Sequence, residues 1–267
     1  MINLIKVCKS FKGQKVLYNL DLNIEPEKIT VIIGRSGGGK SVLLKHIMGL
    51  IKPDSGQVFI DGIDISGLND NKLNEIRKMF GMLFQDAALF DSMTVGENVA
   101  FPLKEHTKLS KKEIDKIVEE KLLQVDLKNI THKIPSELSG GMRKRVGLAR
   151  AIALNPKIVL FDEPTTGLDP IMCEGIDNLI INTQRHTKAT FVVISHDIGS
   201  TFKIAHNIAM LYEGKIITIE PRKKYDYQII LLSNGSFPEK PEKSVKKVLF
   251  KQIITNFKSK SYVKTKC

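Results

Sequence analysis

A glycine-rich stretch is the first part of this sequence whose residue types point to chemistry. It reads Gly34-Arg35-Ser36-Gly37-Gly38-Gly39-Lys40-Ser41 and fits the pattern G-x-x-x-x-G-K-[ST]. Glycines let consecutive backbone N–H groups curl around phosphate oxygens at the start of a helix, where donors are unpaired and the dipole favours an anion. In such a loop the Lys40 ammonium reaches the β- and γ-phosphates, and the Ser41 hydroxyl ligates Mg²⁺. The stretch therefore predicts a site for the phosphates of a nucleotide and for Mg²⁺.

An acidic pair follows a second apolar run further along the chain. Ile158–Phe161 has the composition of a buried strand, and Asp162 and Glu163 come directly after it. We expect Asp162 to lie in the Mg²⁺ shell and Glu163 to polarise a water for attack on the γ-phosphate. Alone, such a pair is typical of a solvated turn. Together with the glycine-rich stretch, it predicts hydrolysis of a nucleoside triphosphate.

A third motif lies shortly before the acidic pair. Ser139-Gly140-Gly141-Met142-Arg143-Lys144-Arg145 can form a second anion site, because a serine can cap a helix and paired glycines permit close approach of a phosphate. With Leu138 in front, the segment resembles the LSGGQ signature of ABC-type ATPases. A lone S-G-G is common in loops, so the identification depends on the order and spacing of all three motifs.

The resemblance implies roles for four further residues. Gln85 matches the Q-loop glutamine, which contacts Mg²⁺ and the attacking water, and His196 matches the switch histidine that contacts the γ-phosphate. Asp169 matches the D-loop residue that links two subunits. Phe11 is the candidate for the aromatic ring that stacks on adenine, although an aromatic near a strand end is more often core. The resemblance also implies a homodimer with two shared ATP sites, in which the signature of one subunit closes over the phosphate loop of the other.

Strands and helices that alternate along the chain must hold these motifs in place. Ile29–Ile33 is an apolar run typical of a buried parallel strand, and it leads through the glycine-rich stretch into a helix at Val42–Met48. Further strands are predicted at residues 57–60, 157–161 and 189–194. The alternation predicts an α/β fold with a mainly parallel sheet covered by helices. The resemblance specifies a P-loop NTPase of ABC type, with an antiparallel β subdomain and an inserted helical subdomain.

The residue pattern changes from strand-like to helix-like near residue 87, which predicts that a helical insertion begins there. Ser110 and Glu113 have the spacing of a capping box, and apolar residues follow at helical spacing for about four turns. The first thirty residues, in contrast, are expected to form short strands and turns. The expected organisation is 1–86 (nucleotide-binding core with the β subdomain and phosphate loop), 87–140 (helical subdomain ending in the signature), 141–232 (remainder of the core) and 233–267 (basic C-terminal tail).

Composition and charge exclude several other classes of protein. The 267 residues are 42% apolar and 26% charged, which indicates a globular chain. No apolar run approaches the roughly 18 to 20 residues that span a bilayer. The formal charge is +12, but residues 239–267 hold nine lysines against two glutamates, so most of the excess lies in the tail and no nucleic-acid partner is predicted. The three cysteines are too far apart for a metal site or a disulfide framework.

Two segments narrow the resemblance to the ATPases of Mla-type lipid transporters. They are residues 79–90 and 98–107, and Met142 in place of the usual signature glutamine points the same way. Both segments lie where an ABC ATPase meets its permease. The resemblance therefore implies integral membrane permease subunits and a lipid-binding, membrane-anchored companion. It also implies a peripheral position on the cytoplasmic face of the inner membrane, or on the stromal side in a plastid.

Two other functions fit the ATPase motifs. A soluble ABC ATPase of iron–sulfur cluster assembly needs no permease, and the Mla-like segments favour lipid transport over it. A DNA-repair ABC ATPase fits the positive charge, but the residues between Lys40 and Asp162 hold no long coiled-coil insertion. The lysine-rich tail leaves two interpretations open, an amphipathic helix on anionic lipid or a solvated terminus.

Overall fold

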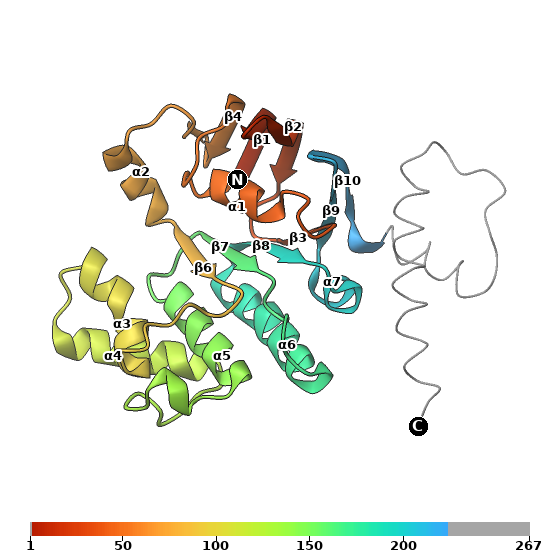
Figure 1. Cartoon of the computed structure of the whole chain (residues 1–267). Coiled ribbons are helices and arrows are strands. Elements are labelled where there is room, and N and C mark those ends of the chain that lie inside the picture. Colours follow the sequence, from red (N-terminus) through yellow and green to blue (C-terminus); the bar gives the residue numbers. More distant parts are fainter. Residues whose placement is uncertain (1, 224–267) are drawn as a thin grey trace, which may run out of the picture. The chain divides into compact units, whose positions relative to one another are not determined.

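The computed structural model describes residues 2–223, which form two sheets and the helices around them (Figure 1). The predicted basic tail at 233–267 lies outside these residues. The strands are β1 (Ile2–Phe11), β2 (Gln14–Ile24), β3 (Ile29–Gly34), β4 (Ser55–Ile60), β5 (Ile63–Asp64), β6 (Phe80–Leu83), β7 (Ile158–Asp162), β8 (Thr190–Ser195), β9 (Asn207–Tyr212) and β10 (Lys215–Pro221). The helices are α1 (Lys40–Ile47), α2 (Asp70–Arg77), α3 (Val95–His106), α4 (Lys111–Gln124), the 3-10 helix η1 (Pro135–Glu137), α5 (Gly140–Ala151), α6 (Pro170–Thr187) and α7 (Ile198–Ile204).

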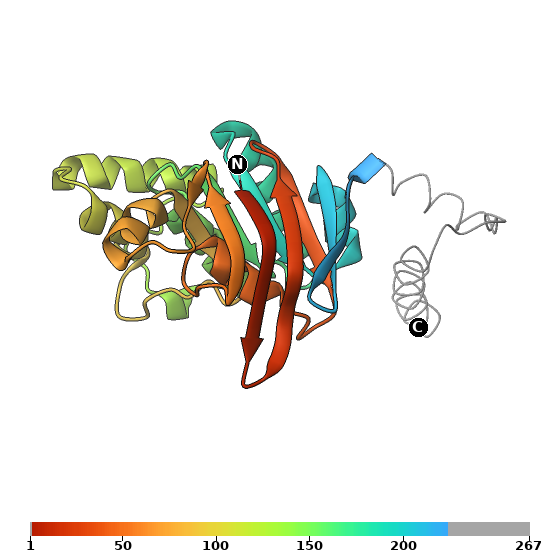
Figure 2. The same ribbon diagram turned by 90° about the horizontal axis from the view of Figure 1, so that it is seen from above.

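The first sheet is antiparallel, in the order β2-β1-β4-β5. Its hairpin of β1 and β2 is long (Figure 2), with strands of 10 and 11 residues. The expectation of short strands at the start of the chain is therefore wrong. The reason is a shift of register between Leu4 and Val7, which places both side chains in the core three positions apart. Such an irregularity breaks the period-two pattern that marks a strand in a sequence without ending the strand.

The second sheet has the order β10-β9-β3-β8-β7-β6, and its strands from β9 to β6 are parallel to their neighbours. The apolar run at Ile29–Ile33 forms β3 between two parallel partners and is buried along its whole length. Burial on both faces explains why this strand has a continuous apolar sequence rather than an alternating one. The predicted mainly parallel sheet is confirmed.

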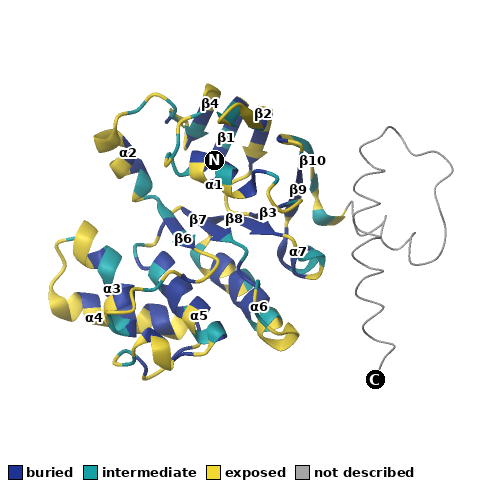
Figure 3. Ribbon diagram, in the orientation of Figure 1, coloured by how far each residue is buried: buried dark blue, intermediate teal, exposed yellow. Residues whose placement is uncertain are grey.

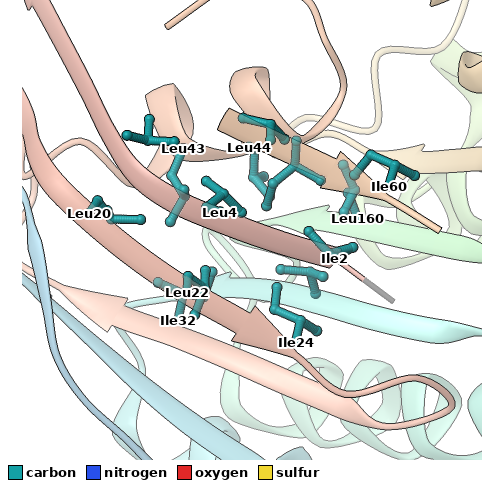
Figure 4. Close-up of a cluster of buried hydrophobic side chains, with 14 of the residues drawn as sticks. Ile2, Leu4, Leu20, Leu22, Ile24, Ile32, Leu43, Leu44, Ile60 and Leu160 are labelled. Carbon is teal, nitrogen blue, oxygen red and sulfur yellow. The ribbon is translucent and has the colours of Figure 1, made fainter. Parts of the chain in front are cut away.

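Helix α1 packs in the main core, which both sheets share (Figure 4). Leu43 and Leu44 of this helix pack with Leu4 of the antiparallel sheet and with Ile32 and Leu160 of the parallel sheet. Each buried aliphatic side chain of this size contributes about 1.5 to 3 kcal/mol. The core therefore fixes the helix that directly follows the glycine-rich stretch.

The chain between β6 and β7 is largely helical, as predicted for the insertion. Helices α3, α4 and α5 pack on one another, and α5 also packs on β6. The predicted capping box at the start of α4 forms with both of its hydrogen bonds, and α3 begins with a second one at Thr94 and Glu97. Burial in α4 follows one face, with the other exposed, whereas α5 is buried along most of its length (Figure 3). Within residues 2–223, no helix has the length and apolar character to cross a bilayer.

Candidate functional site

Four neighbouring parallel strands end at one edge of the larger sheet. The registers pair Leu83 with Phe161, Asp162 with Ile194, and Ile33 with Ser195. Residues that directly follow β6, β7, β8 and β3 are therefore brought to the same edge, where open α/β sheets bind their ligands. They are Gln85, Glu163, His196 and the glycine-rich stretch 34–41.

The glycine-rich stretch forms a loop that folds back on the lysine at its end. The Lys40 ammonium donates hydrogen bonds to the carbonyls of Gly34 and Arg35, each at 3.0 Å. Gly39 stands at the N-cap of α1 with φ 95° and supplies no side-chain cap, so the first N–H groups of the helix point toward the loop. A Cβ at Gly39 would lie 3.1 Å from Cγ1 of Val16 on β2. The left-handed backbone and this close approach both favour glycine at position 39.

Charges of both signs lie close together at the loop. Burial lowers the pKa of Lys40, and the nearby Glu163 and Asp162 carboxylates act in the opposite direction. Burial and the Glu163 charge raise the pKa of Asp162, against a hydrogen bond from Ser41 and the charge of Lys40. A partly buried carboxylate beside a hydroxyl, with a second carboxylate nearby, is an oxygen-donor set that suits a hard cation such as Mg²⁺. The residues present thus fit the predicted metal.

The Glu163 carboxylate is held by two side chains. Its Oε2 lies 3.0 Å from Nδ1 of His196 and accepts a hydrogen bond of 2.9 Å from the Thr166 hydroxyl. The Glu163 N–H donates to the carbonyl of Ile194 on β8 at 3.0 Å, so the residue is tied to the neighbouring strand. The Glu163 side chain is 19% exposed and that of His196 59%. The geometry suits a general base that is oriented by its neighbours and open to water.

Comparison with known proteins shows the family of the chain. The family model described as ABC transporter matches residues 17–166. The chain belongs to the ABC transporter family. An intermembrane phospholipid transport system ATP-binding protein, MlaF of Haemophilus influenzae, is 45% identical over 218 residues, which cover 80% of this chain and 83% of that protein. MlaF of Escherichia coli K12 is 42% identical over 207 residues, covering 77% of each chain.

A probable ribonucleotide transport ATP-binding protein, mkl of Mycobacterium bovis, is 44% identical over 215 residues and 80% of this chain. The match covers only 60% of the length of the mkl protein. Among solved structures, the dimeric post-hydrolysis state of the ATP-binding cassette MJ0796, bound to ADP and Pi, matches with a TM-score of 0.75 and 35% identity over 83% of this chain and 99% of that one. The cassette cbiO1 of Clostridium perfringens matches with a TM-score of 0.80 and 28% identity over 87% and 93%. The α/β fold is therefore that of the ABC cassettes.

The signature segment lies at the start of α5 and packs against the D-loop. Ser139 is the N-cap of α5 and accepts from the Met142 N–H at 3.3 Å. A Cβ at Gly140 would lie 3.5 Å from the Leu168 side chain, and one at Gly141 would lie 3.4 Å from that of Met172. Asp169 in turn caps α6 and is exposed, as is Ser139. Among residues 2–223, no hydrogen bond joins Ser139, Gly140 or Gly141 to the phosphate loop.

Two predicted residues lie at the margins of the site. Phe11 ends β1, is 44% exposed and has the Lys9 ammonium 5.6 Å from its ring centroid. The side chains of the same sheet that approach the phosphate loop are Val16 and Leu17, whose carbons lie 3.1 and 3.2 Å from the position of a Cβ at Gly39. Sequence reasoning missed them because apolar residues in a strand look like ordinary core. Gln85 is exposed, and the loop behind it is held by the Arg150 guanidinium, which donates to the carbonyl of Ala87 at 2.7 Å.

Sequence reasoning also missed Thr166 and Lys144. Thr166 contacts the Glu163 carboxylate, and the Lys144 ammonium donates to the carbonyl of Thr166 at 3.0 Å. The position of Thr166, three residues after Glu163, was the available signal, because a threonine at that spacing can turn back on the carboxylate. No comparable signal marked Lys144, whose partner is 22 residues away.

Proposed function

We propose that this chain is the ATP-binding and ATP-hydrolysing subunit of an ABC transporter that moves phospholipid between membranes. The observation that carries hydrolysis is the Glu163 carboxylate, 3.0 Å from His196 and beside the charged pair of Lys40 and Asp162. Support for the cargo comes from the MlaF relatives, which are named as intermembrane phospholipid transport ATP-binding proteins.

Each predicted residue has a role in this proposal. Glu163 takes a proton from the attacking water, and His196 holds that carboxylate and contacts the γ-phosphate. Lys40 and the backbone N–H groups of 34–41 bind the phosphates. Phe11 stacks on adenine. Mg²⁺, when bound, neutralises developing phosphate charge, and its protein ligands would be Ser41, Asp162 and Gln85.

The proposal includes a second copy of this chain. The exposed cap of α5, formed by Ser139 with Gly140 and Gly141, would close over the phosphate loop of the partner copy, and the exposed Asp169 would link the two subunits. A pair of identical subunits with isologous symmetry completes both sites at once. The dimeric MJ0796 cassette supports such an arrangement.

The further partners are integral membrane permease subunits and a lipid-binding, membrane-anchored companion. The chain would lie on the cytoplasmic face of the inner membrane. In its organisation we assign 1–86 and 141–232 to the nucleotide-binding core, 87–140 to the helical subdomain and 233–267 to a basic tail. The relatives named above concern transport, which favours this function over iron–sulfur cluster assembly.

Hydrolysis is tested by replacing the proposed base with its isosteric amide. Glu163→Gln is expected to retain binding of Mg²⁺-ATP and to lower kcat at least about 100-fold, because a general base contributes about 10² to 10⁴. Lys40→Ala is the matched contrast, since it should weaken nucleotide binding about 10-fold or more by removing a charged donor. Hydrolysis at the normal rate by Glu163→Gln would contradict the assigned base.

Transport is tested by what accompanies the chain in its native membranes. After gentle solubilisation with detergent and affinity purification, we expect a multispanning permease and a lipid-binding companion, identified by mass spectrometry. Phosphorus analysis of the purified complex should then detect bound phospholipid. Recovery of soluble iron–sulfur assembly proteins in place of a permease would leave the ATP chemistry intact and contradict the transport function.

A further inference from the structure

Helix α5 carries a buried lysine that none of the proposed roles uses. Lys144 is 5% exposed, and its ammonium donates to the carbonyl of Thr166 at 3.0 Å. Burial lowers the pKa of Lys144, and the charges of Asp86, Cys173 and Glu163 act against that shift. Burying an ammonium is costly unless its donors find acceptors. A side chain of this kind therefore holds its acceptor firmly, and the acceptor lies in the loop after the proposed base.

Thr166 is tied to that base through two hydrogen bonds. Its hydroxyl donates to Oε2 of Glu163 at 2.9 Å, and its N–H donates to the Glu163 carbonyl at 3.2 Å. The same Oε2 lies 3.0 Å from Nδ1 of His196. Two neighbours on the same carboxylate oxygen restrict the rotation of the Glu163 side chain. A continuous chain of contacts thus runs from the Lys144 ammonium through Thr166 to the Glu163 carboxylate.

We propose that Lys144 and Thr166 are positioning residues for hydrolysis: Thr166 orients the Glu163 carboxylate, and Lys144 holds Thr166 in place to do so. The proposal rests on the proposed function, in which Glu163 is the base. It also has a consequence for α5, because this helix begins at Ser139. A movement of α5 that accompanies closure of the signature over a second subunit would be passed to the base of its own subunit.

The hydroxyl is tested with a pair of conservative variants. Thr166→Val keeps the shape of the side chain without the donor, and we expect kcat to fall about tenfold, because small misplacement of a catalytic group costs 10- to 100-fold. The KM for ATP and the Kd for a fluorescent ATP analogue should stay within about twofold, since the phosphate loop is unchanged. Thr166→Ser restores the donor and should recover most of the activity. Equal kcat for Thr166→Val and the unaltered chain would overturn the role of Thr166.

The ammonium is tested against a buried lysine elsewhere in the helical region. Lys121 is 6% exposed, and its ammonium donates to the side chain of Asn155 at 2.6 Å. Asn155 precedes β7, whereas the proposed base follows the other end of that strand. Lys144→Met and Lys121→Met remove the same charge from equally buried sites, so both should lower the melting temperature. We expect only Lys144→Met to lower kcat, by about 5- to 10-fold at an unchanged Kd for nucleotide. If kcat fell by the same factor in both variants, loss of stability would explain the fall. That result would overturn the role of Lys144.

The order of action is tested in the Glu163→Gln background. If Thr166 acts through the carboxylate, adding Thr166→Val to Glu163→Gln should leave the residual hydrolysis, measured in a single-turnover assay, within about twofold. A further tenfold fall would show that Thr166 acts by another route and would overturn the inference while leaving the proposed function standing. Absence of ATP hydrolysis by the unaltered full chain would instead overturn the proposed function, and the inference with it.

Discussion

A buried histidine in α1 makes the stability of the fold depend on pH. His46 is 1% exposed, and its Nδ1 lies 2.8 Å from the carbonyl of Val42. Its Nε2 is buried and has no hydrogen-bond partner among the described residues. Burial lowers the pKa of His46, a nearby Lys9 adds to the effect, and the Val42 contact and Asp54 oppose it. The folded protein therefore prefers the neutral imidazole more strongly than the unfolded chain does.

This preference has a defined sign for stability. The contribution of His46 is fully present above its ordinary pKa of about 6.5 and is lost as the pH falls through the lower pKa of the folded state. We expect the loss of unfolding free energy between pH 7.5 and pH 5, measured with urea, to be smaller in His46→Leu than in the unaltered protein. The exposed His132 is the control, and His132→Leu should keep the original slope. Identical slopes for both variants would rule out this role of His46.

At the scale of elements, the contact of α5 with β6 depends on a glycine. A Cβ at Gly81 would lie 2.0 Å from the backbone oxygen of Ala151, at the end of α5. Backbone cannot yield as a side chain does, so Gly81→Ala must push the helix from the strand. We expect a loss of about 3 kcal/mol in unfolding free energy, measured by chemical denaturation. Gly67→Ala, where a Cβ meets no atom within 4 Å, should change stability by less than about 0.5 kcal/mol.

Which elements could be predicted from sequence depended on how local their signals are. Residues close together in the sequence specify the strand at Ile29–Ile33 and the capping box of Ser110 and Glu113, and both predictions are confirmed. The second box, at Thr94 and Glu97, has the same signature and was missed because Pro102 interrupts the helical pattern. The hydrogen bond from Lys144 to Thr166 joins residues far apart in sequence, and no local pattern specifies it. The motifs located the candidate site, whereas the contacts that orient it required the fold.

At the scale of the whole molecule, the arrangement of the two anion sites predicts an ATP-dependent dimer. Glu163→Gln with Mg²⁺-ATP should sediment as a dimer in analytical ultracentrifugation, and with ADP as a monomer, because ATP is the ligand that both subunits contact. Adding Ser139→Asp to this variant keeps a good helix cap but sets a negative charge against the partner's triphosphate. We expect the dimer to weaken at least about tenfold.

The matched control for that experiment is Ser110→Asp, since Ser110 caps α4 in the same way as Ser139 caps α5. Its dimer should be unaffected. A dimer equally stable in the Ser139→Asp and Ser110→Asp variants would show that the cap of α5 does not meet the nucleotide of a second subunit.

At Glu163, the residue that is best for protein stability differs from the residue that is proposed to hydrolyse ATP. Glu163 has φ 50°, a left-handed conformation that costs a residue with a side chain about 1 to 2 kcal/mol and that glycine or asparagine adopts more easily. In a mutant library screened only for heat resistance, glycine or asparagine at position 163 should therefore be enriched. The same library screened for growth that depends on this protein should return glutamate. Selection of this chain for stability alone would therefore remove the proposed base, and with it ATP hydrolysis.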